Sequence, residues 1–126
     1  MDSIQIIDNF LSETSVFYLT TVDCDKPRCR PIGFHLLKDD KLYFGVGTFK
    51  DVYAQMQVNP NVEICASKGG KFLRYYGKAV FETNDIIAND ILSRSPSLSK
   101  IYNDSTGHKL GIFHLENAIG EIHVMS

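Results

Sequence analysis

The stretch FYLTTVDCDKPRCRPIGF, residues 17–34, decides the fold. Its first part belongs to a run of β-branched and aromatic residues, Val16–Val22, which is typical of a strand. Asp23–Pro27 is rich in turn residues, and a second strand is expected to run from Arg28 to Leu37. Two strands joined by so short a turn predict an antiparallel hairpin.

The chain beyond this hairpin repeats the succession of short strands and tight turns. Further strands are expected at Leu42–Val46, Val62–Ser67, Phe72–Phe81 and Leu110–Val124, the last in one or two pieces. Lys38–Lys41 and the Gly69–Gly70 pair have the composition of hairpin turns. Gly77, alone inside a strand, indicates a bulge or a close backbone approach.

Three segments with helical spacing interrupt the strands. They are expected at residues 4–11, 48–58 and 84–102, the last broken at Pro96. Thr48 is expected to cap the second helix, with Asp51 at the acidic position of a partial capping box. The Asn-Pro-Asn sequence at 59–61 is expected to end that helix.

The predicted fold class is therefore mainly β, a six-stranded antiparallel β-barrel with peripheral helices. Consecutive short strands joined by hairpin turns favour such a barrel over the parallel sheet of alternating strands and helices. A helix between the third and fourth strands interrupts a simple meander, so a β-sandwich stays the alternative.

Length and composition limit the classes of function. The chain has 126 residues, a length that predicts a single domain over residues 1–126. Its residues are 44% hydrophobic and 22% charged, as in an ordinary soluble protein. A net charge of −2 gives no reason to expect nucleic acid or anionic membrane as a partner. No apolar run approaches the roughly 20 residues of a membrane-spanning helix. Residues 1–14 show no secretion signal, so a cytoplasmic protein is expected.

The cysteines and histidines support no metal or disulfide site. The three cysteines, Cys24, Cys29 and Cys65, are odd in number and form no CxxC pair. Reduced thiols are therefore expected rather than a disulfide framework or a zinc knuckle. The histidines near the C-terminus share no ligand spacing, and we expect no metal.

Basic residues gather on two neighbouring segments. Arg28 and Arg30 are two apart in a strand and point to one face, while Cys29 between them is expected to be a core thiol on the other face. Thr48 and Lys50 stand at the expected start of a helix, where free backbone N–H groups favour an anion. Together these groups suit a phosphate monoester. The alternative is three solvated surface charges, because such spacing is common.

Three segments, in this order and with these gaps, resemble the pyridoxamine 5'-phosphate oxidase-like, FMN-binding split-barrel superfamily. They are FYLTTVDCDKPRCRPIGF, LYFGVGTFKDVYAQMQVNPNVEICAS and FLRYYGKAVFE, at residues 17–34, 42–67 and 72–82. Within this superfamily the chain is similar to the small members grouped with the Nim nitroimidazole-resistance proteins. The resemblance implies a split barrel of the FMN-binding type.

The resemblance also implies a homodimer with FMN in a groove at the subunit interface. The second strand would lie along the flavin, the third would give backbone contacts, the helix start would hold the phosphate, and the strand from Phe72 would reach the flavin of the other subunit. The implied cofactor-binding residues are Arg28, Cys29, Arg30, Pro31, Ile32, Tyr43, Phe44, Thr48, Lys50, Phe72 and Arg74.

Two departures from the family oxidase narrow the expected activity. Phe49 stands where that enzyme often has Arg, which leaves fewer cationic contacts, and Arg30 is a candidate replacement. The tail Gly120–Ser126 lacks the basic, histidine-containing motif of true pyridoxamine phosphate oxidases, so that reaction is not expected.

The function implied is that of an FMN-binding flavoprotein. It would be an oxidoreductase acting on an unidentified small molecule, for example a nitro compound, and no side chain stands out as a general acid or base. Two alternatives from other classes stay open. One is a non-catalytic flavin carrier or sensor, and the other is a split barrel that binds heme or another small ligand.

Overall fold

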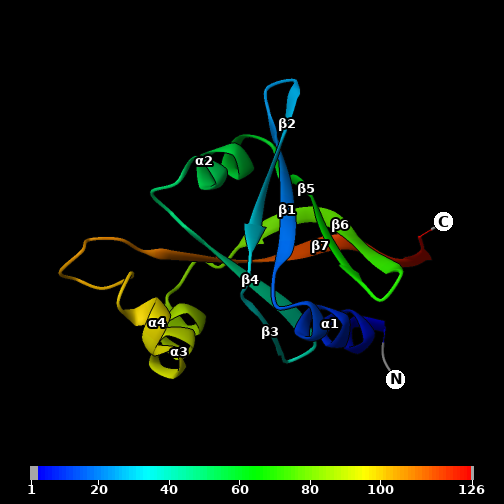
Figure 1. Ribbon diagram of the computed structural model, residues 1–126. Helices are drawn as coiled ribbons and strands as arrows, with labels where there is room; N and C mark the ends of the chain where they lie inside the picture. Colours follow the sequence, from blue (N-terminus) through cyan, green and yellow to red (C-terminus); the bar gives the residue numbers. More distant parts are fainter. Residues whose placement is uncertain (1–2, 126) are drawn as a thin grey trace.

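A computed structural model describes residues 3–125, so that Met1, Asp2 and the last residue of the tail, Ser126, lie outside the described part. Strands dominate the described chain, and helices lie around them (Figure 1). In chain order the elements are α1 (Ser3–Thr14), β1 (Phe17–Asp23), β2 (Lys26–Ile32), β3 (His35–Lys38), β4 (Lys41–Gly47), α2 (Asp51–Val58), β5 (Asn61–Lys68), β6 (Lys71–Phe81), α3 (Ile86–Arg94), α4 (Pro96–Ser99) and β7 (Leu110–Val124).

The strands form one antiparallel sheet in the order β2-β1-β5-β6-β7-β4-β3. The mainly-β expectation is confirmed, but the sheet has seven strands instead of six. The expected strand from Arg28 to Leu37 is two strands, because the chain changes its pairing partner halfway. Ile32 pairs with Phe17 of β1, whereas His35 pairs with Phe44 of β4, and the two residues between them belong to neither strand.

The tight turns follow the sequence prediction. Asp39 and Asp40 between β3 and β4, and Gly69 and Gly70 between β5 and β6, all have positive φ, as two-residue hairpin turns with the right twist require. Gly77 lies at a register shift in the β6–β7 ladder. A Cβ there would lie 2.7 Å from a backbone oxygen of β7, so the bulge and the close approach are both confirmed.

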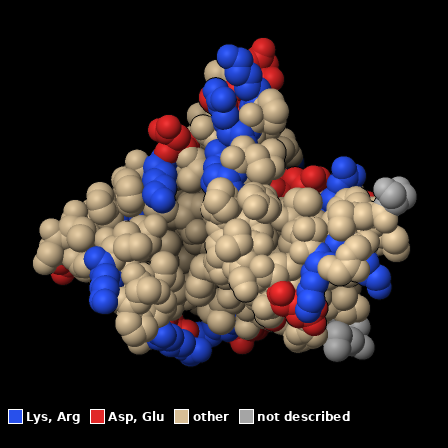
Figure 2. Space-filling view, viewed as in Figure 1, with Lys and Arg blue, Asp and Glu red and all other residues tan. Residues whose placement is uncertain are grey.

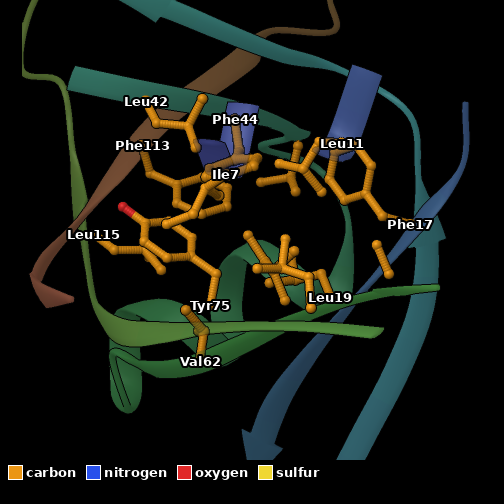
Figure 3. Packing of buried hydrophobic residues seen from close by; sticks show 14 of the residues in the cluster. Ile7, Leu11, Phe17, Leu19, Leu42, Phe44, Val62, Tyr75, Phe113 and Leu115 are labelled. Atoms are coloured by element: carbon orange, nitrogen blue, oxygen red, sulfur yellow. The ribbon is translucent and has the colours of Figure 1, made fainter. Parts of the chain in front are cut away.

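The main core lies on one face of the sheet. Inward residues alternate along β1, β5 and β6 and meet large side chains of β4 and β7, such as the fully buried Phe44 and Phe113. Figure 3 shows these side chains pointing toward one another, with Ile7 and Leu11 of α1 among them. A second, smaller cluster packs Ala88 and Ile91 of α3 on the other side of β4 and β7.

The helices occupy the three insertion points that the sequence indicates. The break at Pro96 is confirmed, because α3 ends at Arg94 and Pro96 begins α4. The expected cap of α2 is wrong: the helix begins at Asp51, its N-cap is Lys50, and no side chain caps it. None of the helices among residues 3–125 is long and apolar enough to cross a membrane.

Candidate anion-binding cleft

Edge strand β2 forms one wall of a cleft made of two joined cavities. One cavity, of about 450 Å³, lies between the second half of β2, the end of β4 and α4. The other, of about 560 Å³, lies between β2 and the start of α2. Arg30, Pro31, Lys50 and Val52 line both cavities, so the two form one continuous cleft. Each cavity falls in the range of roughly 300–1,000 Å³ that small-molecule sites occupy.

The cavity beside α2 is the positively charged end of the cleft. Arg28, Arg30 and Lys50 all line it. Figure 2 shows Lys and Arg side chains gathered along the projecting β1–β2 hairpin, and another at α2 next to an acidic one. Two carboxylates, Asp23 and Asp51, also line this cavity, so the balance depends on which cations they neutralise.

Arg28 is neutralised by a neighbour. Its Nε lies 3.1 Å from Oδ2 of Asp23, at the other side of the hairpin turn. The Arg28 side chain is 50% exposed, and such a surface pair is worth about 0–1 kcal/mol. Arg28 can therefore bind an anion only if its guanidinium contacts the anion and Asp23 together, or if its ion pair with Asp23 breaks.

Arg30 has a different environment, although it lies on the same strand face. Its guanidinium donates to the backbone oxygen of Leu19, to Oγ1 of Thr21 and to Oε1 of Gln55 on α2. Burial lowers the pKa of Arg30, and the nearby Cys29 opposes this by raising it. No carboxylate of a described residue lies within 4.0 Å of this guanidinium. A half-buried cation held only by neutral groups keeps its charge available for a bound anion.

Lys50 stands at the other side of the same cavity. As N-cap it precedes α2 instead of lying in its first turn, and the backbone N–H of Lys50 bonds to Gly47 in a tight turn. Its ammonium lies 5.8 Å from the ring of Phe49 and pairs with no carboxylate among residues 3–125. Phe49 itself stacks on His108 at 3.9 Å and lies before α2, although the sequence predicts it inside a helix over residues 48–58.

Thr48 does not take part in the cleft. Its backbone N–H and its hydroxyl both donate to the carbonyl oxygen of Lys109, at 3.0 and 3.3 Å. This contact holds Thr48 at the sheet and moves the helix start two residues on. The hydroxyl that the sequence offered for a phosphate is therefore engaged elsewhere in this structure.

The other end of the cleft is mostly apolar. Phe34, Val46, Leu98 and Leu110 line it, together with the backbone of Gly45 and Gly47. A Cβ at Gly47 would lie 2.7 Å from the Phe49 ring and 3.2 Å from the Tyr102 hydroxyl, so only glycine leaves this wall undisturbed. Such a surface suits a flat, largely apolar ring next to a charged group.

Tyr43 and Phe44 offer no side chain to the cleft. Phe44 is fully buried in the main core, and Tyr43 is buried in the second cluster, where burial first and the acids Glu82 and Asp39 next raise its pKa. The part of β4 that lines the cleft is Gly45–Gly47, just beyond them. Backbone contacts from this strand thus remain available, two residues later than expected.

Phe72 and Arg74 of β6 line neither cavity of the same chain. Arg74 lies 3.8 Å from Glu63 and 5.9 Å from the Phe72 ring, which stacks on His123. The register places Arg74 opposite Cys65, and Cys65 opposite Tyr18, so these three side chains share the outer face of the sheet. Within one chain they are separate from the cations of β2.

Cys29 of the predicted site and His35, the histidine nearest to it in sequence, complete the account. Cys29 is exposed and lines the charged cavity, so the expectation of a core thiol is wrong: β2 is an edge strand whose hairpin projects beyond the core. His35 does not line the cleft, because its Nδ1 lies 2.6 Å from Oδ1 of Asp8 and ties β3 to α1. Among residues 3–125 no group of three His, Cys, Asp or Glu is placed to hold a metal ion.

Sequence reasoning missed the residues that hold Arg30 and several that line the cleft. Gln55 and Thr21 hold Arg30, and Ser95, Ser97 and Tyr102 reach the apolar end from the α4 region. The position of Gln55, three residues after the buried Val52 on α2, was a usable signal for an inward-facing polar group. Nothing local in the sequence indicates that α4 would approach β2.

Comparisons with known proteins agree with this architecture. The family model described as pyridoxamine 5'-phosphate oxidase matches residues 5–111. The crystal structure of a NimC/NimA family protein from Clostridium acetobutylicum is 30% identical with a TM-score of 0.88, over 98% of this chain and 89% of that one. A search of curated proteins found no match.

More distant structures share the fold with different ligands. One is a pyridoxamine 5'-phosphate oxidase-related, FMN-binding protein from Nostoc punctiforme, 16% identical with a TM-score of 0.62 over 92% of this chain and 82% of that one. Another is HutZ, a heme storage protein from Vibrio cholerae, 16% identical with a TM-score of 0.64 over 98% of this chain and 95% of that one. At this identity the likeness concerns the fold alone.

Proposed function

We propose a function from one premise, which is that this chain belongs to the pyridoxamine 5'-phosphate oxidase family. The chain is a cytoplasmic FMN-binding flavoprotein of the split-barrel type, in one domain over residues 1–126, and works as an oxidoreductase on a small molecule. The observation that carries this proposal is the cleft along β2, with cations at one end and an apolar, glycine-lined wall at the other.

The residues present fit FMN. Arg28, Arg30 and Lys50 surround one end of the cleft, where a phosphate would neutralise cations that now lack enough carboxylates. Pro31, Ile32 and the backbone of Gly45–Gly47 would face the ring system at the other end. FMN, when bound, supplies the transfer of electrons that side chains alone do not provide.

The chain's own residues would bind and orient the flavin and keep water from one of its faces. Val52, Leu98 and Tyr102 close the cleft on the side of the helices. Burial raises the pKa of Tyr102 further above neutral pH, where a tyrosine hydroxyl is already protonated and can donate.

A homodimer belongs to this proposal. Tyr18 and Ile119, each about half exposed at 49% and 51%, lie on the outer sheet face that also carries Arg74. Exposed apolar residues on a sheet face favour contact with another protein surface. In the dimer, Phe72 and Arg74 of one subunit would reach the flavin of the other, which explains why neither lines the cleft of its own chain.

The absorption spectrum of the purified protein, with mass analysis of the released ligand, tests the proposal. We expect flavin bands and the mass of FMN, or saturable FMN binding by protein isolated without ligand. A Soret band would instead indicate heme, and absence of any flavin binding would contradict the proposal.

A second experiment separates an enzyme from a carrier. Incubation of the flavin-loaded protein with NAD(P)H and a nitroaromatic compound should give repeated turnover if the chain is a reductase. Bound flavin without turnover, across a set of donors and oxidants, would favour a non-catalytic carrier or sensor.

A further inference from the structure

Another cavity, of about 490 Å³, lies outside the cleft and under α1. It shares no lining residue with either cavity of the cleft. Ile4, Ile6 and Ile7 line it from α1, and Leu115 and Ile122 line it from β7. We call this cavity the α1 pocket. Its volume is in the range of roughly 300–1,000 Å³ that small-molecule sites occupy.

Core packing fixes the walls of the α1 pocket. Ile7 and Leu115 both belong to the main core, and each is 7% exposed. Beside them, β7 passes so close to α1 that a Cβ at Gly120 would lie 2.5 Å from Cδ1 of Ile7. The pocket is therefore a preformed extension of the core.

One polar side chain, Tyr75 of β6, is buried in these apolar walls. Tyr75 is 5% exposed and lines the pocket, and no described residue donates to its hydroxyl or accepts from it. Figure 3 shows its ring within the core cluster, with the hydroxyl oxygen on the side of Leu115. Burial raises the pKa of Tyr75 further above neutral pH, where the hydroxyl can donate. A buried hydroxyl without a partner is costly, so an acceptor inside the pocket would stabilise it.

The other lining residues restrict the chemistry of a ligand. None of the described residues that line the α1 pocket is charged, so a buried ion would find no counterion there. Ile6 and Ile122 line the pocket and are still 40% and 42% exposed, so an apolar ligand would cover surface that now faces water. The site therefore suits a neutral, mostly apolar molecule with one hydrogen-bond acceptor.

The α1 pocket and the proposed dimer contact lie on opposite faces of the sheet. Tyr75 pairs with Gly120, and the next residue pair is Arg74 with Glu121. Because side chains alternate along a strand, Arg74 lies on the outer face and Tyr75 on the inner one. A dimer through the outer face thus leaves the pocket accessible.

We propose that the α1 pocket is a second ligand site, which binds a neutral aromatic ketone or a molecule of similar chemistry, with Tyr75 as donor to the carbonyl oxygen. This inference goes beyond the proposed function, because no residue of the pocket belongs to the cleft. The site would bind its ligand whether or not the cleft holds a flavin.

Two naphthalenes of similar shape test the role of the hydroxyl. 2-Acetylnaphthalene carries a carbonyl oxygen, and 2-isopropylnaphthalene has a methyl group in its place. Titration followed by backbone amide NMR shifts gives each Kd and locates the ligand, with shifts expected at Gly120 and Ile122. Tyr75→Phe should weaken binding of the ketone about threefold to tenfold, as for one neutral hydrogen bond, and leave the hydrocarbon within about twofold. Tyr43→Phe is the matched control, because Tyr43 is also buried and does not line the pocket.

Ala118→Phe gives an independent test if Tyr75→Phe fails to fold. Ala118 lines the pocket and is exposed, so a ring at this position should fill the space and abolish binding of both naphthalenes. Several results would overturn the inference: no binding by the wild type, shifts at Gly45–Gly47 of the cleft instead, or equal effects of Tyr75→Phe on the two compounds. A marked loss of stability in Tyr75→Phe would also overturn it, because the hydroxyl would then have a partner inside the protein. If Ala118→Phe instead changes the sedimenting mass of the protein, the pocket is a contact between subunits and the inference is wrong.

Discussion

At the scale of single residues, two arginines of one strand differ in whether a carboxylate neutralises their charge. Both Arg28 and Arg30 face the charged cavity, yet Arg28 is paired with Asp23, and Arg30 is held only by neutral groups. Their spacing predicted the shared face correctly. It could not predict the difference, because Gln55, which holds Arg30, lies 25 residues away in the chain.

Phe44 was predicted to bind the cofactor, but the structure places it in the core, and a substitution can distinguish these two roles. Its ring is fully buried against Phe17 and Phe113, and it does not line the cleft. Phe44→Leu should therefore lower the free energy of unfolding by about 1 kcal/mol or more, since it leaves a cavity in the core. The FMN Kd should stay within about twofold of the wild type. Denaturant unfolding and flavin titration check the two parts, and a large loss of affinity in the folded variant would place Phe44 at the ligand.

At the scale of elements, local sequence signals predicted the hairpin turns correctly. They did not predict where α2 begins or where β2 ends. Paired turn residues such as Asp39–Asp40 and Gly69–Gly70 act within their own hairpin, so their effect is visible in the sequence. The start of α2 depends on the bond between Thr48 and Lys109, 61 positions apart. The break between β2 and β3 depends on the change of partner from β1 to β4. Both are tertiary effects.

Gly77 provides a prediction for the β6–β7 ladder. In Gly77→Ala the new Cβ would lie 2.7 Å from the backbone oxygen of Glu116, which cannot turn away as a side chain does. We expect a loss of about 1–3 kcal/mol in the free energy of unfolding. Gly45→Ala is the control, because its Cβ would meet the flexible end of Leu110 at 3.1 Å and should cost less. Equal losses in denaturant unfolding would contradict a backbone clash at the bulge.

The same two strands predict a dependence of stability on pH. Hydrogen bonds from Tyr76 and then His123 lower the pKa of Glu121 below its usual value of 4.5. A carboxyl whose pKa is lower in the folded state stabilises the fold above its unfolded pKa, and this contribution is lost as pH falls through the folded pKa. The difference in unfolding free energy between the wild type and Glu121→Gln should therefore shrink below pH 4.5. A difference that is constant from neutral to acid pH would contradict the coupling.

At the scale of the whole molecule, the proposed site needs two chains. Sedimentation velocity at micromolar concentration should give twice the mass of one chain, because the flavin contacts of Phe72 and Arg74 come from the partner subunit in this account. A monomer under these conditions would contradict the interface site.

Mixing two defective variants tests the exchange of residues between subunits. Arg74→Ala should damage the partner's half of each site, and Lys50→Ala should damage the chain's own half. After unfolding and refolding together, mixed dimers contain one site with neither change, so part of the FMN binding should return. If the mixture binds no more than the average of the two variants, the two residues belong to one chain's site.

The central claim is that the cations of β2 and of the α2 start meet on one phosphate. Arg28→Ala combined with Lys50→Ala removes two of the three cations that line the charged cavity and leaves Arg30 alone. The account predicts that the FMN Kd rises by at least about tenfold and that the yellow colour is lost on desalting, while the wild type keeps it. Retention of FMN by the double variant as firmly as by the wild type would contradict it.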